Sequence, residues 1–226
     1  MEDWLLLRSG AGSAAFNMAV DDALLLRVRE VGKPVLRFYA WSEPAASFGY
    51  FQRYAEVAKA TPLRPLVRRP TGGGIVPHDR DWTYSVVLPP GHFWYQLKAI
   101  ESYRRVHEWL RAAFNETGIP AELASERRRE VAGQCFAGAE QFDVLAQNRK
   151  IAGAAQRRTR DGLLIQGSVQ PPAGVKREAW EDRVCDVAVK NWQVSWLQWQ
   201  LPHPVARAVE VLAADKYGTR EHNERR

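Results

Sequence analysis

The segment RRPTGGGIVPHD, residues 68–79, gathers residue types that could hold an anion or an acyl group. A run of glycines after a strand lets backbone N–H groups approach a ligand closely, because no side chain stands in the way. Arg68 and Arg69 would add positive charge beside this run. A glycine-rich hairpin with surface arginines is the alternative, because the spacing matches neither the dinucleotide-binding nor the nucleoside-triphosphate-binding glycine pattern.

A second segment, residues 135–158, carries a cysteine and a lysine. Lys150 opens a predicted strand of small and apolar residues, so its ammonium could reach along a groove to a carbonyl or phosphate oxygen. A solvated lysine on an edge strand is the alternative. Cys135 could react as a thiolate if the arginines at 127–129 fold close to it and lower its pKa. Otherwise it is a buried, unreactive thiol, which is what we expect of Cys185.

The elements that must position these residues mix strands and helices. Apolar spacing predicts helices at 13–32, 95–118 and 204–218. Predicted strands are 34–41, 45–52, 64–69, 75–79, 82–89, 142–147, 150–158 and 163–170, and 219–226 is expected to be a frayed tail. Because strict βαβ alternation is missing, we predict an α+β fold with a mixed, largely antiparallel sheet flanked by helices.

Composition bounds the class of protein. The chain has 226 residues and a formal net charge of +6, which favours acidic partners such as nucleic acid, an anionic membrane surface or an acidic protein. No apolar run approaches ~20 residues, and the acidic start MEDWLLLRSG does not resemble a signal peptide. Two cysteines make no disulfide framework, so we expect a cytoplasmic protein. We expect one catalytic domain over 1–226, with a helical extension over 171–226 and no accessory domain.

Several motifs in order resemble the biotin/lipoate protein ligase superfamily on its lipoate side. RRPTGGGIVPHD matches the signature R-R-x-x-G-G-G-x-V-x-H-D, and NRKIAGAAQRR followed by GLLIQGSV resembles the lysine motif. FNMAVDDALL and RFYAWSEPAASFGYFQ resemble the N-terminal helix and the first hairpin, so the motifs cover about residues 4–170. The resemblance implies the catalytic-domain fold of that superfamily.

The resemblance leaves two enzymatic branches open. Lipoate–protein ligases use ATP and Mg²⁺ to make lipoyl-AMP, and then pass the acyl group to a lysine of an acceptor domain. Octanoyltransferases take octanoate from acyl carrier protein without ATP, and one kind passes it through a thioester on an enzyme cysteine. A non-catalytic module that binds acyl groups or nucleic acid is a further alternative. Nucleic acid is disfavoured because we find no helix-turn-helix signature and no basic residues interleaved with aromatics.

Individual residues favour the cysteine transferase. The pair Cys135-Phe136 precedes Lys150 by fifteen residues, the separation seen in cysteine transferases that resemble this chain. Phe142 stands where ligases carry an asparagine for the adenylate and metal, although Gly74 follows the ligase form. The resemblance then makes Cys135 the nucleophile and Lys150 the donor to the acyl oxyanion. No cofactor and no metal are required in this branch.

Partners and binding residues follow from the same resemblance. Acyl carrier protein and a lipoyl-bearing acceptor, either glycine-cleavage H protein or a dehydrogenase E2 domain, would dock on the basic stretches 127–129 and 157–160. His78 and Asp79 are candidates for shaping the glycine loop or assisting proton transfer, and Phe48, Val76 and Ile151 for lining an eight-carbon slot, with ordinary core packing as the alternative. The candidate substrate-binding residues are Arg69, Gly72, Gly73, Gly74, Val76, His78, Asp143, Gly153 and Ala155.

Overall fold

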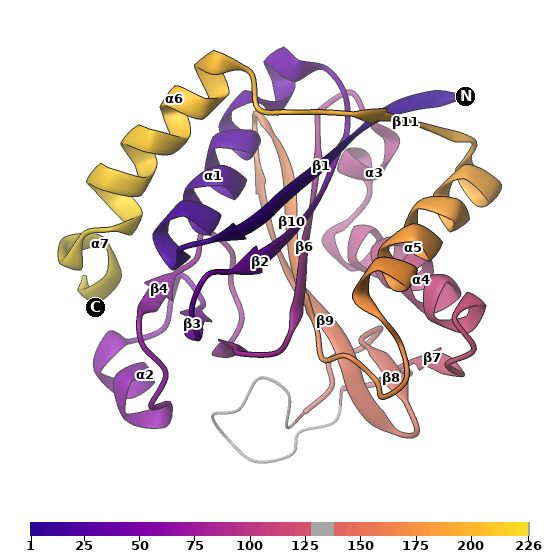
Figure 1. Ribbon diagram of the computed structural model, residues 1–226, viewed down its shortest axis with the longest axis horizontal. Coiled ribbons are helices and arrows are strands. Elements are labelled where there is room, and N and C mark those ends of the chain that lie inside the picture. Colours follow the sequence, from indigo (N-terminus) through magenta and orange to yellow (C-terminus); the bar gives the residue numbers. More distant parts are fainter. Residues whose placement is uncertain (128–137, 226) are drawn as a thin grey trace.

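The computed structural model describes residues 1–127 and 138–225, and its centre is an eight-stranded sheet in the order β11-β1-β2-β6-β10-β9-β8-β7 (Figure 1). The strands are β1 (Glu2–Gly12), β2 (Val35–Trp41), β6 (Trp82–Leu88), β7 (Ala121–Leu123), β8 (Val144–Ala146), β9 (Arg149–Thr159), β10 (Gly162–Val169) and β11 (Val194–Gln198). Strand β1 runs parallel to β11 and β2, and every other neighbouring pair is antiparallel. The predicted mixed, largely antiparallel sheet is therefore confirmed.

A smaller sheet, in the order β4-β3-β5, lies beside the large one. Its strands are β3 (Ala45–Phe48), β4 (Leu66–Arg68) and β5 (Val76–His78). Strand β3 pairs with β4 and β5 and not with β2, so the predicted hairpin of the segments before and after Ser42 is wrong. The glycine run lies between β4 and β5, at the junction of the two sheets.

Helices cover both faces of the large sheet (Figure 1). They are α1 (Ala14–Val31), α2 (Tyr54–Ala60), α3 (Phe93–Gln96), α4 (Ala99–Glu116), α5 (Arg177–Trp192), α6 (His203–Leu212) and α7 (Arg220–Glu224), with a π-helical turn η1 at Ala213–Tyr217. Helices α1 and α6 pack together on one face, and α4 and α5 on the other. No helix in residues 1–127 and 138–225 is long and apolar enough to cross a bilayer.

Strand β1, which we did not predict, shows why the sheet has two cores. Trp4 and Leu6 belong to the core under α4 and α5, whereas Leu5 and Leu7 belong to the core under α1. A strand buried on both faces has a continuous apolar run without the alternation that marks a half-buried strand. Strand β11 and helices α2 and α5 were also not predicted individually.

Helix α1 begins and ends where the sequence predicts. The hydroxyl of Ser13 accepts from the N–H of Phe16 at 3.2 Å, and Gly32 ends the helix with a φ of +72°. The predicted buried face is confirmed except for Phe16, which is exposed; the buried members are Val20, Ala23, Leu24 and Val28. The helix thus seals one face of the sheet and carries polar residues toward the glycine loop.

Candidate active site

The hairpin of β8 and β9 holds a lysine against a buried carboxylate. Nζ of Lys150 lies 2.8 Å from Oδ2 of Asp143, and the lysine side chain is only 11% exposed. Gln147 and Asn148 form the turn with positive φ angles, which suits a tight hairpin. Because β9 lies between β8 and β10, the alternative of a solvated lysine on an edge strand is wrong.

Two more donors fix the carboxylate of Asp143. The backbone N–H of Glu140 donates to Oδ2 at 2.7 Å, and the hydroxyl of Tyr103 on α4 donates to Oδ1. The Tyr103 oxygen also accepts from the N–H of Ala154 at 3.3 Å. Burial, and then the carboxylate beside it, raises the pKa of Tyr103 well above its ordinary value, so the phenol remains protonated and donates. Asp143 is therefore a rigid anchor for Lys150.

Arg69 folds back on the glycine loop. Its Nε and Nη2 atoms donate to the carbonyl oxygen of Gly72, Nε at 3.0 Å, and Nη1 donates to Oγ of Ser47 at 3.3 Å. The φ of Gly73 is +89°, and a Cβ there would lie 2.7 Å from Nη2 of Arg69. Only glycine fits at this position. The arginine therefore shapes the loop, and Gly74 completes the run half-exposed.

The loop and strand β9 approach each other through small residues. A Cβ at Gly73 would lie 3.8 Å from Cβ of Ala155. Gly153, two residues earlier on β9, lies directly against Lys150 and Asp143. The lysine, its carboxylate, the small residues of β9 and the glycine loop are thus brought together. Such an arrangement can present an ammonium and backbone N–H groups to a carbonyl or phosphate oxygen.

Arg68 points away from this groove and is fully buried. Its Nε and Nη2 atoms donate to the carbonyl oxygens of His222 at 3.2 Å and Asn223 at 2.9 Å. Its backbone N–H donates to Oδ1 of Asn223 at 2.8 Å. Both predictions for these segments are wrong: Arg68 adds no charge beside the loop, and residues 219–225 do not form a frayed tail. Helix α7 is held because its carbonyl groups satisfy buried guanidinium donors.

His78 on β5 lies behind the loop in a chain of buried hydrogen bonds. Its Nε2 atom is 2.8 Å from Oγ of Ser47, and its Nδ1 atom is 2.8 Å from Oδ2 of Asp81. The imidazole stacks on Trp41 with ring centroids 3.8 Å apart. Oγ of Ser47 also accepts from Nη1 of Arg69, which folds back on the glycine loop, and these contacts favour the loop-shaping role for His78 over proton transfer.

Asp79, the other candidate for shaping the glycine loop or assisting proton transfer, is exposed, and the carboxylate that contacts His78 is that of Asp81. Val76 is half-buried on the same strand. Of the three residues considered for an acyl slot, Phe48 and Ile151 are buried in separate hydrophobic clusters, which is the core-packing alternative.

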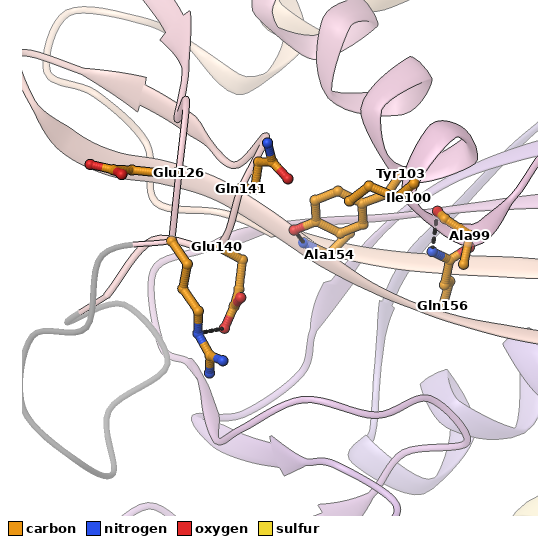
Figure 2. A pocket seen from close by; sticks show the side chains of 9 residues that line it. Ala99, Ile100, Tyr103, Glu126, Glu140, Gln141, Ala154 and Gln156 are labelled. Atoms are coloured by element: carbon orange, nitrogen blue, oxygen red, sulfur yellow. Dashed lines mark hydrogen bonds and ion pairs between the residues drawn. The ribbon is translucent and has the colours of Figure 1, made fainter.

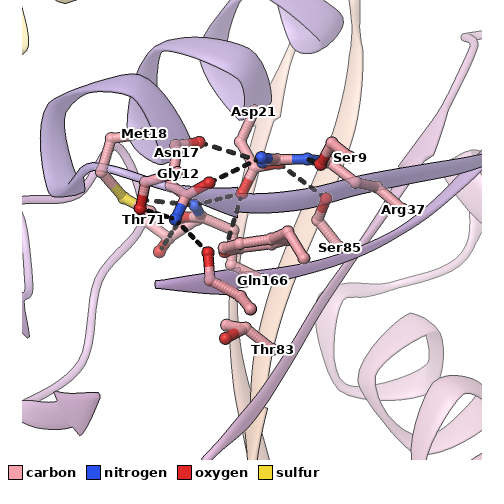
Figure 3. A network of polar contacts seen from close by, with 12 residues as sticks. Ser9, Gly12, Asn17, Met18, Asp21, Arg37, Thr71, Thr83, Ser85 and Gln166 are labelled. Carbon is pink, nitrogen blue, oxygen red and sulfur yellow. Dashed lines mark hydrogen bonds and ion pairs between the residues drawn. The ribbon is translucent and has the colours of Figure 1, made fainter. Parts of the chain in front are cut away.

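A buried polar network ties the loop to α1 and β2 (Figure 3). The Thr71 hydroxyl donates to Oε1 of Gln166 at 2.8 Å, and Nε2 of Gln166 donates to Oδ2 of Asp21 at 2.7 Å. Asp21 in turn forms an ion pair of 2.7 Å with Arg37, and both side chains have no exposed surface. The network fixes the residue immediately before the glycines, because each member is satisfied by the next.

An open pocket of about 640 Å³ lies on the α4 side of β9 (Figure 2). Tyr103, Ile100 and Ala154 give it apolar surface, and Gln156 is held at its edge by a bond of 2.7 Å to the carbonyl of Ala99. Arg127 forms an ion pair of 3.0 Å with Glu140 at the other end. Since the Tyr103 hydroxyl lies between this pocket and Asp143, the pocket adjoins the lysine site.

Cys135, the predicted nucleophile, lies outside the described residues, as do Arg128 and Arg129. Cys185 is buried on α5, and burial raises its pKa to about 12, so it is an unreactive thiol as predicted. Among the described residues no group of three or more His, Cys, Asp or Glu side chains could hold a metal ion.

Sequence reasoning missed the residues that support the site. Tyr103 was assigned to the apolar stripe of its helix, because spacing cannot show that a hydroxyl meets a carboxylate. Asp21 and Arg37 gave a signal, since each is a charged residue inside an otherwise apolar element and such residues are buried only when paired. Gln166 and Thr71 gave none.

Comparison with known proteins identifies the family of the chain. The model of the lipoyl protein ligase A/B catalytic domain matches residues 13–170. Octanoyltransferase LipM of Kyrpidia tusciae is 39% identical over 181 residues, covering 75% of this chain and 66% of the relative. Octanoyltransferase LipM of Bacillus subtilis is 35% identical over 181 residues, covering 74% of this chain and 65% of the relative. The matched segment thus spans just under two thirds of each relative.

A solved structure shows the same fold. Lipoate-protein ligase A bound with ATP superposes with a TM-score of 0.80 at 21% sequence identity, covering 99% of both chains. With the family model matching most of the sequence, the chain belongs to the lipoyl protein ligase A/B catalytic domain family.

Proposed function

We propose that this protein is an octanoyltransferase of protein lipoylation. It moves an octanoyl group from acyl carrier protein to a lysine of a lipoyl-bearing domain, and it does so without ATP. Membership of the family and the curated octanoyltransferase relatives support this reaction. The structural observation that carries it is the ammonium of Lys150, fixed by Asp143 beside the small residues of β9 and the glycine loop. The location that we propose, from the cysteine count, is the cytoplasm.

The reaction has two steps under this proposal. The Cys135 thiolate attacks the carbonyl carbon of the octanoyl thioester, and the carrier thiol leaves with the proton that the cysteine gave up. The neutral amine of the acceptor lysine then attacks the new thioester; an amide forms, and the cysteine thiol is regenerated with a proton from that amine. Covalent catalysis divides the transfer into two easier steps, and the amide makes the second one downhill.

Lys150 stabilises the oxyanion in both steps. Its ammonium donates to the acyl oxygen as negative charge develops, and the donor is held in place before the reaction because Asp143 cannot rotate away from its other two partners. Gly72, Gly73 and Gly74 bring the main chain close to the acyl group. Arg69 and His78 act indirectly by holding the loop and its supporting strand.

The ATP-dependent ligase is the competing function, and the residues near Asp143 do not fit Mg²⁺–adenylate. Phe142 offers no donor or ligand atom where ligases carry an asparagine, and its ring lies under the guanidinium of Arg104 at 5.6 Å. Asp143 already accepts from Lys150, Glu140 and Tyr103, so a metal ion would have to displace the lysine. This supports the transferase.

Intact mass spectrometry tests the proposal. We expect wild-type protein incubated with octanoyl-acyl carrier protein, without nucleotide, to gain the mass of one octanoyl group. Cys135→Ser should gain none and should not transfer, whereas Cys185→Ser should behave like wild type. Formation of acyl-AMP from ATP and free acid, together with no reaction with the octanoyl carrier, would replace the transferase by the ligase.

A second experiment tests Lys150. We expect Lys150→Ala to lose about 10²–10³ in transfer rate, the typical effect of removing one oxyanion donor. Lys150→Arg should not restore it, since a planar guanidinium cannot occupy the position of a compact ammonium. Circular dichroism checks that both variants fold, and wild-type turnover by Lys150→Ala would remove the lysine from the mechanism.

A further inference from the structure

An aromatic pair packs directly against the glycine loop. The backbone N–H of Tyr50 donates to the carbonyl oxygen of Thr71 at 2.9 Å. Phe51 follows it, with the two ring centroids 5.1 Å apart, and its side chain is 72% exposed. Aromatic side chains are enriched at protein–protein interfaces relative to the rest of the surface.

Two guanidinium groups flank Tyr50. The guanidinium carbon of Arg225 lies 4.1 Å from the ring centroid, and that of Arg157 lies 5.6 Å from it. Arg157 also donates to the carbonyl oxygen of Pro70 at 3.3 Å, so it is anchored to the loop itself. No carboxylate in residues 1–127 and 138–225 lies within 4 Å of either guanidinium. Within the part of the chain that the structure describes, both positive charges therefore have no acidic side chain to neutralise them.

These four residues come from three distant parts of the chain. Helix α7 brings Arg225 to the site because Arg68 holds the helix, and β9 brings Arg157 from the strand that carries Lys150. We call Tyr50, Phe51, Arg157 and Arg225 the Tyr50 patch. Aromatic side chains beside arginines are residue types enriched in protein–protein hot spots.

We propose that the Tyr50 patch docks the acidic domain that presents the acceptor lysine. This inference rests on the proposed octanoyl transfer and names the surface where its second substrate binds. Carboxylates of the acceptor would pair with the two arginines, and an apolar side chain would cover Phe51. Electrostatic complementarity of this kind speeds encounter and fixes the register of the complex.

The acceptor fits better than the acyl donor. A lysine presents its amine on a four-carbon stem, so the acceptor domain must bind next to the acyl group. Acyl carrier protein presents its thioester on a much longer prosthetic arm and can bind farther away. Tyr50 and Arg157 of the patch donate to two backbone oxygens of the glycine loop, those of Thr71 and Pro70. A domain docked on the patch would therefore lie close to the glycine loop.

Single-stranded nucleic acid fits less well. Stacking on an aromatic platform requires an open ring face. The Tyr50 ring has guanidinium groups close to it, the nearer at 4.1 Å, which leaves Phe51, 72% exposed, as the exposed ring of the patch. A run of stacked bases needs more than one such ring.

The experiment separates the two half-reactions. Wild type, Arg225→Glu and Phe51→Ser are first acylated with octanoyl-acyl carrier protein, and the acyl-enzymes are then mixed with the apo form of a dehydrogenase E2 lipoyl domain. We expect Arg225→Glu to lower kcat/KM of the second step about ten-fold, mainly through KM, and to weaken its dependence on ionic strength. Phe51→Ser should lower it several-fold, and acylation from the carrier should stay within about two-fold of wild type for both variants.

A matched control is Arg183→Glu, which reverses an exposed arginine on α5, on the other side of the sheet. It should leave both steps unchanged. Calorimetric binding of the apo lipoyl domain to Cys135→Ser protein tests the patch even if acyl transfer fails, so the two proposals can fail separately. Three outcomes would each overturn the inference. The variants could lose the first step instead of the second, Arg225→Glu could leave the second step unchanged, or a single-stranded oligonucleotide could displace the lipoyl domain.

Discussion

Gly153 and Lys150 share a space that admits only one side chain. A Cβ on Gly153 would lie 2.6 Å from Cε and 2.8 Å from Nζ of the lysine, and 3.0 Å from Oδ1 of Asp143. The absence of a side chain at one position of β9 is therefore what allows the ammonium to rest against its carboxylate.

We expect Gly153→Ala to lower acyl transfer about 100-fold, because a shift of the ammonium by about 1 Å is enough to lose that much. Gly91→Ala is the control, since a Cβ at Gly91 would meet no heavy atom within 4 Å. Transfer rates and thermal melts of the two variants measure the effect. Equal activity of Gly153→Ala and wild type would show that the lysine position is not critical.

The glycine run contains a second matched pair. Gly73 has a φ of +89° and a crowded Cβ position, whereas a Cβ at Gly72 would meet nothing within 4 Å. We expect Gly73→Ala to reduce the free energy of unfolding by about 1–2 kcal/mol or more, the cost of a left-handed backbone for a residue with a Cβ. Urea denaturation should show Gly72→Ala within about 0.5 kcal/mol of wild type. Loss of activity in Gly72→Ala without loss of stability would place the acyl group against that glycine.

The contact between Thr71 and Gln166 predicts that the loop and the buried network are coupled. Gln166→Leu leaves Asp21 without one buried donor, so we expect it to lower stability by about 1–3 kcal/mol. Thr71→Val should cost less, since it removes only the outer member of the chain. A double-mutant cycle measured by urea denaturation should give a coupling energy of about 0.5–3 kcal/mol. Strict additivity would contradict the network.

Sequence patterns predicted helices and strands well where one buried face or one turn determines the element. Helix α1 has a capping serine and a terminal glycine, and the site residues lie on motifs whose order the superfamily shares. Prediction from the sequence failed where long-range contacts determine the structure. His222 and Asn223 look like part of a polar tail until Arg68, far away in the chain, is seen to need their carbonyl oxygens.

The same limit applies within the site. Asp79 follows His78 directly, yet Asp81 is its partner, because the backbone after β5 turns the nearer carboxylate to solvent. Arg69 looked like a free charge in the motif, and only the folded loop shows that the Gly72 carbonyl takes up two of its nitrogens. Spacing identifies which residues gather, but not which atoms they satisfy.

Because His107 is buried, we expect the free energy of unfolding to fall in mild acid. Burial lowers its pKa to about 4, so the folded protein keeps the imidazole neutral where the unfolded chain, with a pKa near 6.5, would protonate it. The unfolded state therefore binds more protons between about pH 6.5 and 4, and the free energy of unfolding should decrease by about 3 kcal/mol as pH falls through this range. Urea denaturation at several pH values measures it. His107→Gln should flatten the curve, and an unchanged slope in that variant would assign the effect to other groups.

Phe142 offers a test that separates strain from chemistry. Its φ is +72°, in the left-handed region that asparagine adopts much more readily than phenylalanine. We expect Phe142→Asn to relieve about 1–2 kcal/mol of backbone strain and to lose about 0.5–1 kcal/mol from the contact of the ring with Arg104. The net result should be a more stable protein by urea denaturation. Phe142→Leu, which loses the ring and keeps the strain, should be less stable than wild type.

Phe142→Asn should nevertheless form no acyl-AMP from ATP and octanoate. The variant restores the ligase residue, but both oxygens of Asp143 remain engaged by Lys150, Glu140 and Tyr103. A metal ion would still have to break the ion pair, and leaving an ammonium unpaired beside a buried site is costly. Pyrophosphate release measures this directly. If the single substitution brings adenylation, one amide separates the two branches of the family, and the engagement of Asp143 does not.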